Sequence, residues 1–121
     1  MAQHNEVGIQ GEEAAARLLI SKEYRIVARN WRFHGHEIDI VAENEEFIVF
    51  VEVKTRTSVQ WGNPEDFVGK MRIRRMVQAA HDYLIENDVC KPARFDIIGA
   101  VWNGRAFELD HIEDAFLPPV N

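Results

Sequence analysis

Two carboxylates and one amine stand on neighbouring apolar stretches in the first half of the chain. Asp39 lies within the stretch 36–42, and Glu52 follows thirteen positions later. Glu52 and Lys54 are two residues apart near the end of the apolar run 47–56, so they share one face if that run is a strand. Carboxylate oxygens suit Mg²⁺ or Mn²⁺, and a lysine beside them could orient a water molecule or offset developing charge.

The acidic segment between the two stretches predicts a β-hairpin. We take Asn44 and Glu45 as its two turn residues. Asp39 then faces Phe50 across the ladder, which makes Glu52 its diagonal neighbour at roughly 7 Å. A register slip of one residue would send the two carboxylates to opposite faces. Carboxylates this close repel each other, so one must take a proton or a cation must lie between them.

Hydrophobic periodicity predicts the elements that position these residues. Helices are expected at about 6–22 and 65–87, and strands at about 24–33, 36–42, 47–56, 93–101 and 106–112. The Asn103-Gly104 pair is the strongest hairpin signal in the chain. The element order predicts one α/β domain, residues 1–121, in which a mixed five-stranded sheet carries the two main helices on its faces.

The first predicted helix carries a carboxylate on its apolar side. Glu12 shares one helix face with Ala15, Ala16 and Leu19. A carboxylate on a core-facing stripe is costly unless it has a partner. Two interpretations remain open: Glu12 reaches the Asp39–Glu52 site as a ligand of the metal or of its water shell, or it is a glutamate that the dipole favours near a helix start.

The charge of the chain limits the classes of protein to which it can belong. The net charge of −6 argues against a generic nucleic-acid binder, but residues 54–81 carry six basic and two acidic side chains. This local excess fits either a limited phosphate-binding surface or a solvated helix face. No apolar run is long enough to span a membrane and no signal-peptide pattern is present, so a cytoplasmic location is the default expectation.

Several polar side chains are candidates for binding. The basic candidates for contact with a DNA backbone are Arg32, Arg56, Lys70 and Arg74. His34 and His36 could ligate a transition metal, although a polar turn is the favoured interpretation. Trp61 beside Arg56 could stack on an unpaired base or fill the edge of the core.

Taken together, these motifs resemble the YraN-like family of bacterial proteins, which belongs to the PD-(D/E)XK nuclease superfamily and is related to archaeal Holliday-junction resolvases. The matching pieces are Gly8-x-x-Gly11-Glu12-x-x-Ala15, Arg29-Asn30-Trp31-Arg32, Glu37-Ile38-Asp39, Phe50-Val51-Glu52-Val53-Lys54-Thr55-Arg56, Lys70 and Arg94-Phe95-Asp96. The YraN-like pattern usually has glycine where this chain has His36.

The resemblance implies a restriction-endonuclease-like three-layer core and a metal-dependent DNA endonuclease. Asp39, Glu52 and Glu12 would hold Mg²⁺ or Mn²⁺, and Lys54 would complete the catalytic set. Lys70 would face the nuclease cleft, the substrate would be branched or otherwise structured DNA, and a homodimer is a candidate assembly.

Two other classes of function compete with the enzyme. One is a catalytically inactive module that binds nucleic acid or a protein partner in DNA repair, recombination or uptake. The other is a structural module in which Asp39, Glu52 and Lys54 form an internal salt bridge. A structural pair needs no third and fourth partner, so the joint presence of these residues with Glu12 favours the enzyme.

Overall fold

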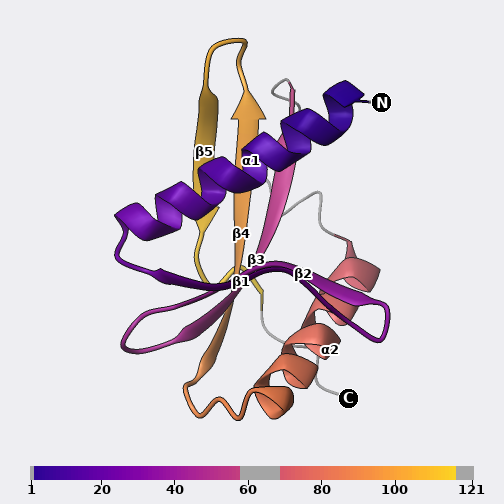
Figure 1. Ribbon diagram of the computed structural model, residues 1–121, viewed down its shortest axis with the longest axis vertical. Coiled ribbons are helices and arrows are strands. Elements are labelled where there is room, and N and C mark those ends of the chain that lie inside the picture. The colour runs from indigo at the N-terminus through magenta and orange to yellow at the C-terminus, as the bar shows by residue number, and fades with distance from the viewer. Residues whose placement is uncertain (1, 58–68, 117–121) are drawn as a thin grey trace.

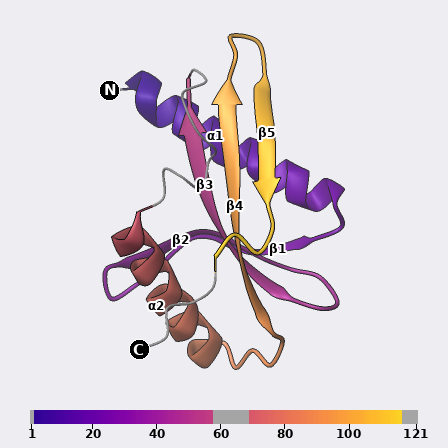
Figure 2. The same ribbon diagram turned by 180° about the vertical axis from the view of Figure 1, so that it is seen from behind.

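A mixed five-stranded sheet carries one helix on each face, as the sequence predicts (Figures 1 and 2). The structure is a computed structural model that describes residues 2–57 and 69–116. Its elements in chain order are α1 (Ala2–Ser21), β1 (Arg25–Phe33), β2 (His36–Glu43), β3 (Ile48–Arg56), α2 (Lys70–Glu86), β4 (Ala93–Trp102) and β5 (Phe107–Ile112).

The strands lie in the sheet in their order along the chain. Neighbouring strands are antiparallel except β3 and β4, which are parallel and are joined through α2. A parallel pair needs a crossover connection, and the helix provides it. The crossover therefore brings α2 back over the sheet beside the predicted site.

The sheet forks between β2 and β3. Their pairing runs from Glu43 opposite Ile48 to Ile40 opposite Val51 and ends there. Beyond that point β2 stays paired with β1 as far as His36, while β3 stays paired with β4. Figure 1 shows the consequence: β1 and β2 run across the view, at a wide angle to β3, β4 and β5.

Each helix covers its own core. Leu19 and the small residues Ala15 and Ala16 of α1 pack on the face of the sheet that carries Val51. On the other face, α2 packs against Phe50. Because residues of β3 are buried on both faces of the sheet, residues 47–53 are apolar except for Glu52, as expected for a central strand.

Several predicted boundaries differ from the structure. The first helix begins at Ala2 instead of near residue 6. The second helix begins at Lys70, and the predicted start at 65–68 lies outside the described residues, as does Trp61. No helix in the described part of the chain is long and apolar enough to cross a membrane.

The predicted two-residue turn between β2 and β3 is wrong. The connection contains four residues, 44–47, because the Asn44 side chain accepts hydrogen bonds from the backbone N–H groups of Glu46 and Phe47. The register is therefore displaced by two residues from the prediction. A displacement of two keeps every side chain on its predicted face.

Candidate functional site

Asp39 and Glu52 meet at the fork of the sheet. One further step in the β2–β3 register would place Asp39 opposite Glu52, instead of diagonal to it as predicted. The strands no longer pair there, and Asp39 Oδ2 instead accepts a hydrogen bond from the Val53 backbone N–H over 2.9 Å. Asp39 is 7% exposed and Glu52 is 8% exposed. Two nearly buried carboxylates thus lie where the sheet opens.

Arg72 of α2 is the cation that joins this pair. Its Nε and Nη2 atoms donate to the two carboxylate oxygens of Glu52 over 2.9 and 2.7 Å. Nη2 also lies 3.8 Å from Asp39 Oδ1, which is an ion-pair contact but too long for a hydrogen bond. The salt bridge that the sequence suggested for Lys54 is therefore made by Arg72 instead.

Sequence reasoning missed the role of Arg72 although a signal was present. The buried residues of α2 are Met76, Ala79, Ala80 and Tyr83. Arg72 precedes Met76 by four residues and Ala79 by seven. This helical spacing puts Arg72 on the buried stripe, one turn before the apolar residues begin.

The electrostatic balance of the pair favours a proton or a cation. Burial raises the pKa of Asp39 to about 8, and the charge of Glu52 adds to this increase. The hydrogen bond from Val53 and the charge of Arg72 oppose the increase without cancelling it. The hydrogen bonds to Glu52 raise the pKa of Arg72 above its ordinary value. Asp39 is therefore short of stabilising partners in its charged form.

Glu12 lies on α1, near enough to the site for the charge of Glu52 to act on it. It is half-buried on α1, and burial raises its pKa while a hydrogen bond with Asn30 opposes the increase. The charges of Glu37 and Glu52 also act on it. Within residues 2–57 and 69–116, no group of three or more His, Cys, Asp and Glu side chains is close enough to hold a metal. The structure thus brings Asp39 and Glu52 together, with Glu12 farther away.

A close contact fixes where Glu12 lies. A Cβ atom on Gly11 would be 2.4 Å from Thr55 Oγ1 and 2.8 Å from Thr55 Cγ2. Glycine at this position lets α1 lie against β3 directly after Lys54. Gly8, one helical turn earlier, has no such neighbour.

The predicted basic residues on β3 and α2 differ in their exposure. Lys54 is half-buried on β3, two residues beyond Glu52 and on the same face. Lys70 and Arg74 are exposed near the start of α2. Arg56 is half-buried at the end of β3. Lys54 and Arg56 thus follow Glu52 on β3, and Lys70 and Arg74 flank Arg72 on α2.

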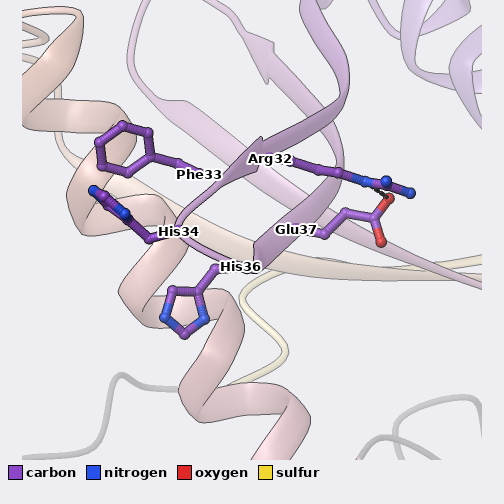
Figure 3. A pocket seen from close by; sticks show the side chains of 6 residues that line it. Arg32, Phe33, His34, His36 and Glu37 are labelled. Carbon is purple, nitrogen blue, oxygen red and sulfur yellow. Dashed lines mark hydrogen bonds and ion pairs between the residues drawn. The ribbon is translucent and has the colours of Figure 1, made fainter.

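The β1–β2 hairpin forms a separate hollow of about 340 Å³ lined by residues 32–37. Figure 3 shows the rings of Phe33, His34 and His36 on one side of the hairpin and the paired side chains of Arg32 and Glu37 on the other. Arg32, a predicted phosphate contact, is exposed and has its Nε 3.2 Å from Glu37 Oε2. The hollow does not include the carboxylate pair.

A second charged cluster surrounds Asp96 on β4. Arg94 donates to both oxygens of Asp96 over 2.9 Å, and His111 Nε2 lies 2.7 Å from Oδ2. The Asp114 backbone N–H donates to Oδ1 over 3.0 Å, and Arg94 also hydrogen-bonds the Tyr24 hydroxyl. Burial raises the pKa of Asp96, but the bonds from His111 and Arg94 outweigh it and leave the pKa below its ordinary value. This cluster is internally satisfied.

The fold and the site define a mixed α/β domain with two nearly buried carboxylates at a fork in its sheet. Residues 11–100 match the uncharacterised protein family UPF0102, and the chain belongs to this family. The predicted membership of the YraN-like family is thereby confirmed, whereas the kinship with PD-(D/E)XK nucleases stays a prediction.

Full-length relatives support the assignment to the family. The chain is 48% identical over 120 residues to a UPF0102 protein of Phocaeicola vulgatus, with 99% of each chain covered. It is 44% identical over 120 residues to a UPF0102 protein of Bacteroides thetaiotaomicron, again with 99% of each chain covered. It is 44% identical over 116 residues to UPF0102 protein FP2501 of Flavobacterium psychrophilum, which covers 96% of this chain and 98% of that one.

Proposed function

We propose that this protein is a cytoplasmic, metal-dependent DNA endonuclease of the PD-(D/E)XK type that hydrolyses phosphodiester bonds in branched or otherwise structured DNA. The observation that carries the proposal is the meeting of Asp39 and Glu52 on one face of the sheet, nearly buried and sharing one guanidinium. Burial and mutual repulsion make two charged carboxylates unfavourable in this arrangement unless a ligand stabilises them.

The donor set fits a hard divalent cation. Mg²⁺ is typically bound through one or two carboxylates and completes its shell with water and phosphate oxygens. Asp39 and Glu52 would provide the carboxylates, the Val53 carbonyl is a further candidate, and Glu12 would act through the water shell. When bound, the cation lowers the pKa of water and neutralises phosphate charge.

The remaining roles belong to basic side chains of this chain. Lys54, half-buried on the same face as Glu52, would orient the attacking water and stabilise negative charge that develops on the phosphate. Lys70 and Arg74 on α2, with Arg56 at the end of β3, would hold the DNA backbone. A homodimer would offer two such sites, one for each strand of a structured substrate.

One observation favours a second candidate, a binding module without catalysis. Arg72 makes a two-pronged ion pair with Glu52, which is also the geometry expected of a purely structural bridge. In that case the carboxylates would bind no metal. Substituting Glu52 would then lower stability and leave binding to DNA or to a protein partner unchanged.

A cleavage assay separates the two functions. The wild type and Glu52→Gln are incubated with single-stranded, duplex, flapped and four-way DNA in Mg²⁺ or Mn²⁺. If the protein is a nuclease, we expect metal-dependent cleavage whose rate falls by at least about 100-fold in Glu52→Gln, because several kcal/mol of transition-state stabilisation are lost. Glu45→Gln, an exposed residue of the β2–β3 connection, is the matched control and should cleave normally. Cleavage that survives Glu52→Gln would exclude the proposed mechanism.

A further inference from the structure

Arg72 occupies the place where the carboxylate pair needs a cation. Its guanidinium contacts Glu52 through two nitrogens and reaches Asp39 Oδ1 at 3.8 Å. The charges of Glu12 and Glu37 also act within this cluster, on Asp39 and on Arg72 respectively. Within residues 2–57 and 69–116, the guanidinium of Arg72 thus contacts a site in which carboxylates outnumber it.

We propose that Arg72 is an internal counter-ion that leaves the Asp39–Glu52 pair when a divalent cation binds, and that the released guanidinium then holds a phosphate of the DNA backbone. This inference rests on the function proposed above. A guanidinium and a divalent cation repel each other, so the pair holds one of them at close range but not both. Release of Arg72 and binding of the cation are therefore thermodynamically coupled.

The position of Arg72 in its helix allows this release. It is the third residue of α2, and the N-cap residue Gly69 has no side chain that could cap the helix. The fully buried residues of the helix begin one turn later, at Met76. The Arg72 side chain is 31% exposed, so rotation about its own bonds can carry the guanidinium to solvent without disturbing the packed part of α2.

The surroundings of α2 favour phosphate as the new partner of Arg72. Lys70, Arg74 and Arg75 are exposed on the same two turns, and the first turn contains no acidic residue. Removing Arg72 from the carboxylates adds a fourth cation to this group. The planar fork that now pairs with Glu52 matches a phosphate equally well. Metal binding would in this way switch on part of the DNA-binding surface.

Equilibrium binding of Mn²⁺, followed by electron paramagnetic resonance of the free ion, tests the competition without measuring cleavage. The full chain is compared with Arg72→Gln and with Arg75→Gln, an exposed arginine of the same helix. We expect Arg72→Gln to bind Mn²⁺ about 5- to 150-fold more tightly, the usual range for coupled sites, and Arg75→Gln to match the wild type. Equal or weaker binding by Arg72→Gln would overturn the role of Arg72.

The same titration separates this inference from the proposed function. Glu52→Gln should abolish Mn²⁺ binding in the presence and absence of the Arg72 substitution. If neither the wild type nor Arg72→Gln binds Mn²⁺, the proposed metal site itself fails. If both bind with equal affinity, the metal site stands and only the counter-ion role is lost.

A measurement on the wild type avoids any loss of folding in the variant. Titration with Mg²⁺ is followed by NMR at the arginine Nε–H groups, with the Arg72 signal assigned from its absence in Arg72→Gln. We expect the Arg72 signal to change as its bond to Glu52 is released, and the Arg75 signal to stay unchanged. An Arg72 Nε–H signal that remains unchanged while bound Mg²⁺ saturates would contradict the displacement.

The binding of phosphate by the released Arg72 can be measured separately. Fluorescence anisotropy of labelled four-way DNA is measured in Ca²⁺, which occupies oxygen sites, and in EDTA. The wild type should bind DNA more tightly in Ca²⁺, and Arg72→Gln should lose that gain while Arg75→Gln keeps it. A full Ca²⁺-dependent gain in Arg72→Gln would exclude the phosphate role.

Discussion

Two nearly buried aspartates in this protein differ sharply in their partners. Asp96 on β4 accepts four hydrogen bonds, from Arg94 twice, from His111 and from the Asp114 backbone. Among the described residues, Asp39 on β2 accepts one, from the Val53 backbone, and lies 3.8 Å from Arg72. Their pKa values move in opposite directions, below the ordinary range for Asp96 and up to about 8 for Asp39.

The comparison shows that burial alone does not distinguish a structural carboxylate from a functional one. Asp96 is 0% exposed and Asp39 is 7% exposed, so both lose most contact with water. The difference is the supply of donors, which is complete for Asp96 and short for Asp39. A buried carboxylate that its own protein leaves under-supplied is a candidate ligand for something that arrives from outside.

The largest expected effect is the loss of the satisfied cluster. Asp96→Asn removes the negative charge that Arg94 pairs with, and an uncompensated buried charge typically costs about 3–5 kcal/mol. We expect the free energy of unfolding, measured with urea, to fall by that amount. Asp110→Asn on the neighbouring strand is exposed and should stay within about 0.5 kcal/mol of the wild type. Equal stability of the two variants would break the comparison.

A smaller effect is expected beside the under-supplied pair. Gly11→Ala puts a methyl group against Thr55, and overpacking of this kind typically costs about 1–3 kcal/mol. Gly8→Ala is the matched control, because the same substitution in the same helix meets open space and should stabilise by up to about 1 kcal/mol. Urea unfolding of both variants measures the difference. A stabilising Gly11→Ala would show that α1 does not depend on this contact.

The remaining expected effect is a difference in the pH dependence of stability, which is given per pH unit. The pKa of Asp39 is about 8 in the folded state and near its ordinary value in the unfolded state. At a pH between these two pKa values, the folded protein therefore binds a proton on Asp39 that the unfolded chain does not bind. The stability that this proton contributes is complete below about pH 4 and is lost as the pH rises through 8. Asp39→Asn should remove this slope, which is at most about 1.4 kcal/mol per pH unit for one proton.

Asp96 should show the opposite sign. Its folded pKa lies below the ordinary value, so its contribution is present above that value and is lost as the pH falls through the folded pKa. Unfolding free energies of the wild type, Asp39→Asn and Asp96→Asn in EDTA from pH 3 to 9 measure both slopes. The comparison fails if the two aspartates give slopes of the same sign.

The sequence predicted the facing of Asp39 and Glu52 correctly in spite of a wrong turn. Side chains alternate along a strand, so a connection of four residues instead of two leaves each residue on its face. The order of strands and helices followed from periodicity in the same way. Local rules of this kind depend only on short stretches of chain.

The partner of the pair could not be predicted with the same rules. Which side of α2 faces the sheet depends on packing against distant strands, so the burial of Ala79 and Tyr83 does not follow from the sequence of the helix alone. In the sequence, Arg72 is one of the six basic residues within 54–81. The fork between β2 and β3 is also a tertiary feature, because it arises where each strand follows a different neighbour.

The crossover that delivers Arg72 has a consequence for how the chain acquires its structure. The β2–β3 hairpin closes over four residues, whereas Arg72 follows β3 in sequence and arrives only when α2 docks. A nascent chain that ends before α2 holds two adjacent carboxylates with no guanidinium between them. We therefore expect the hairpin to form early but its open end to consolidate late, and refolding to be faster in mild acid, where one carboxylate is neutral.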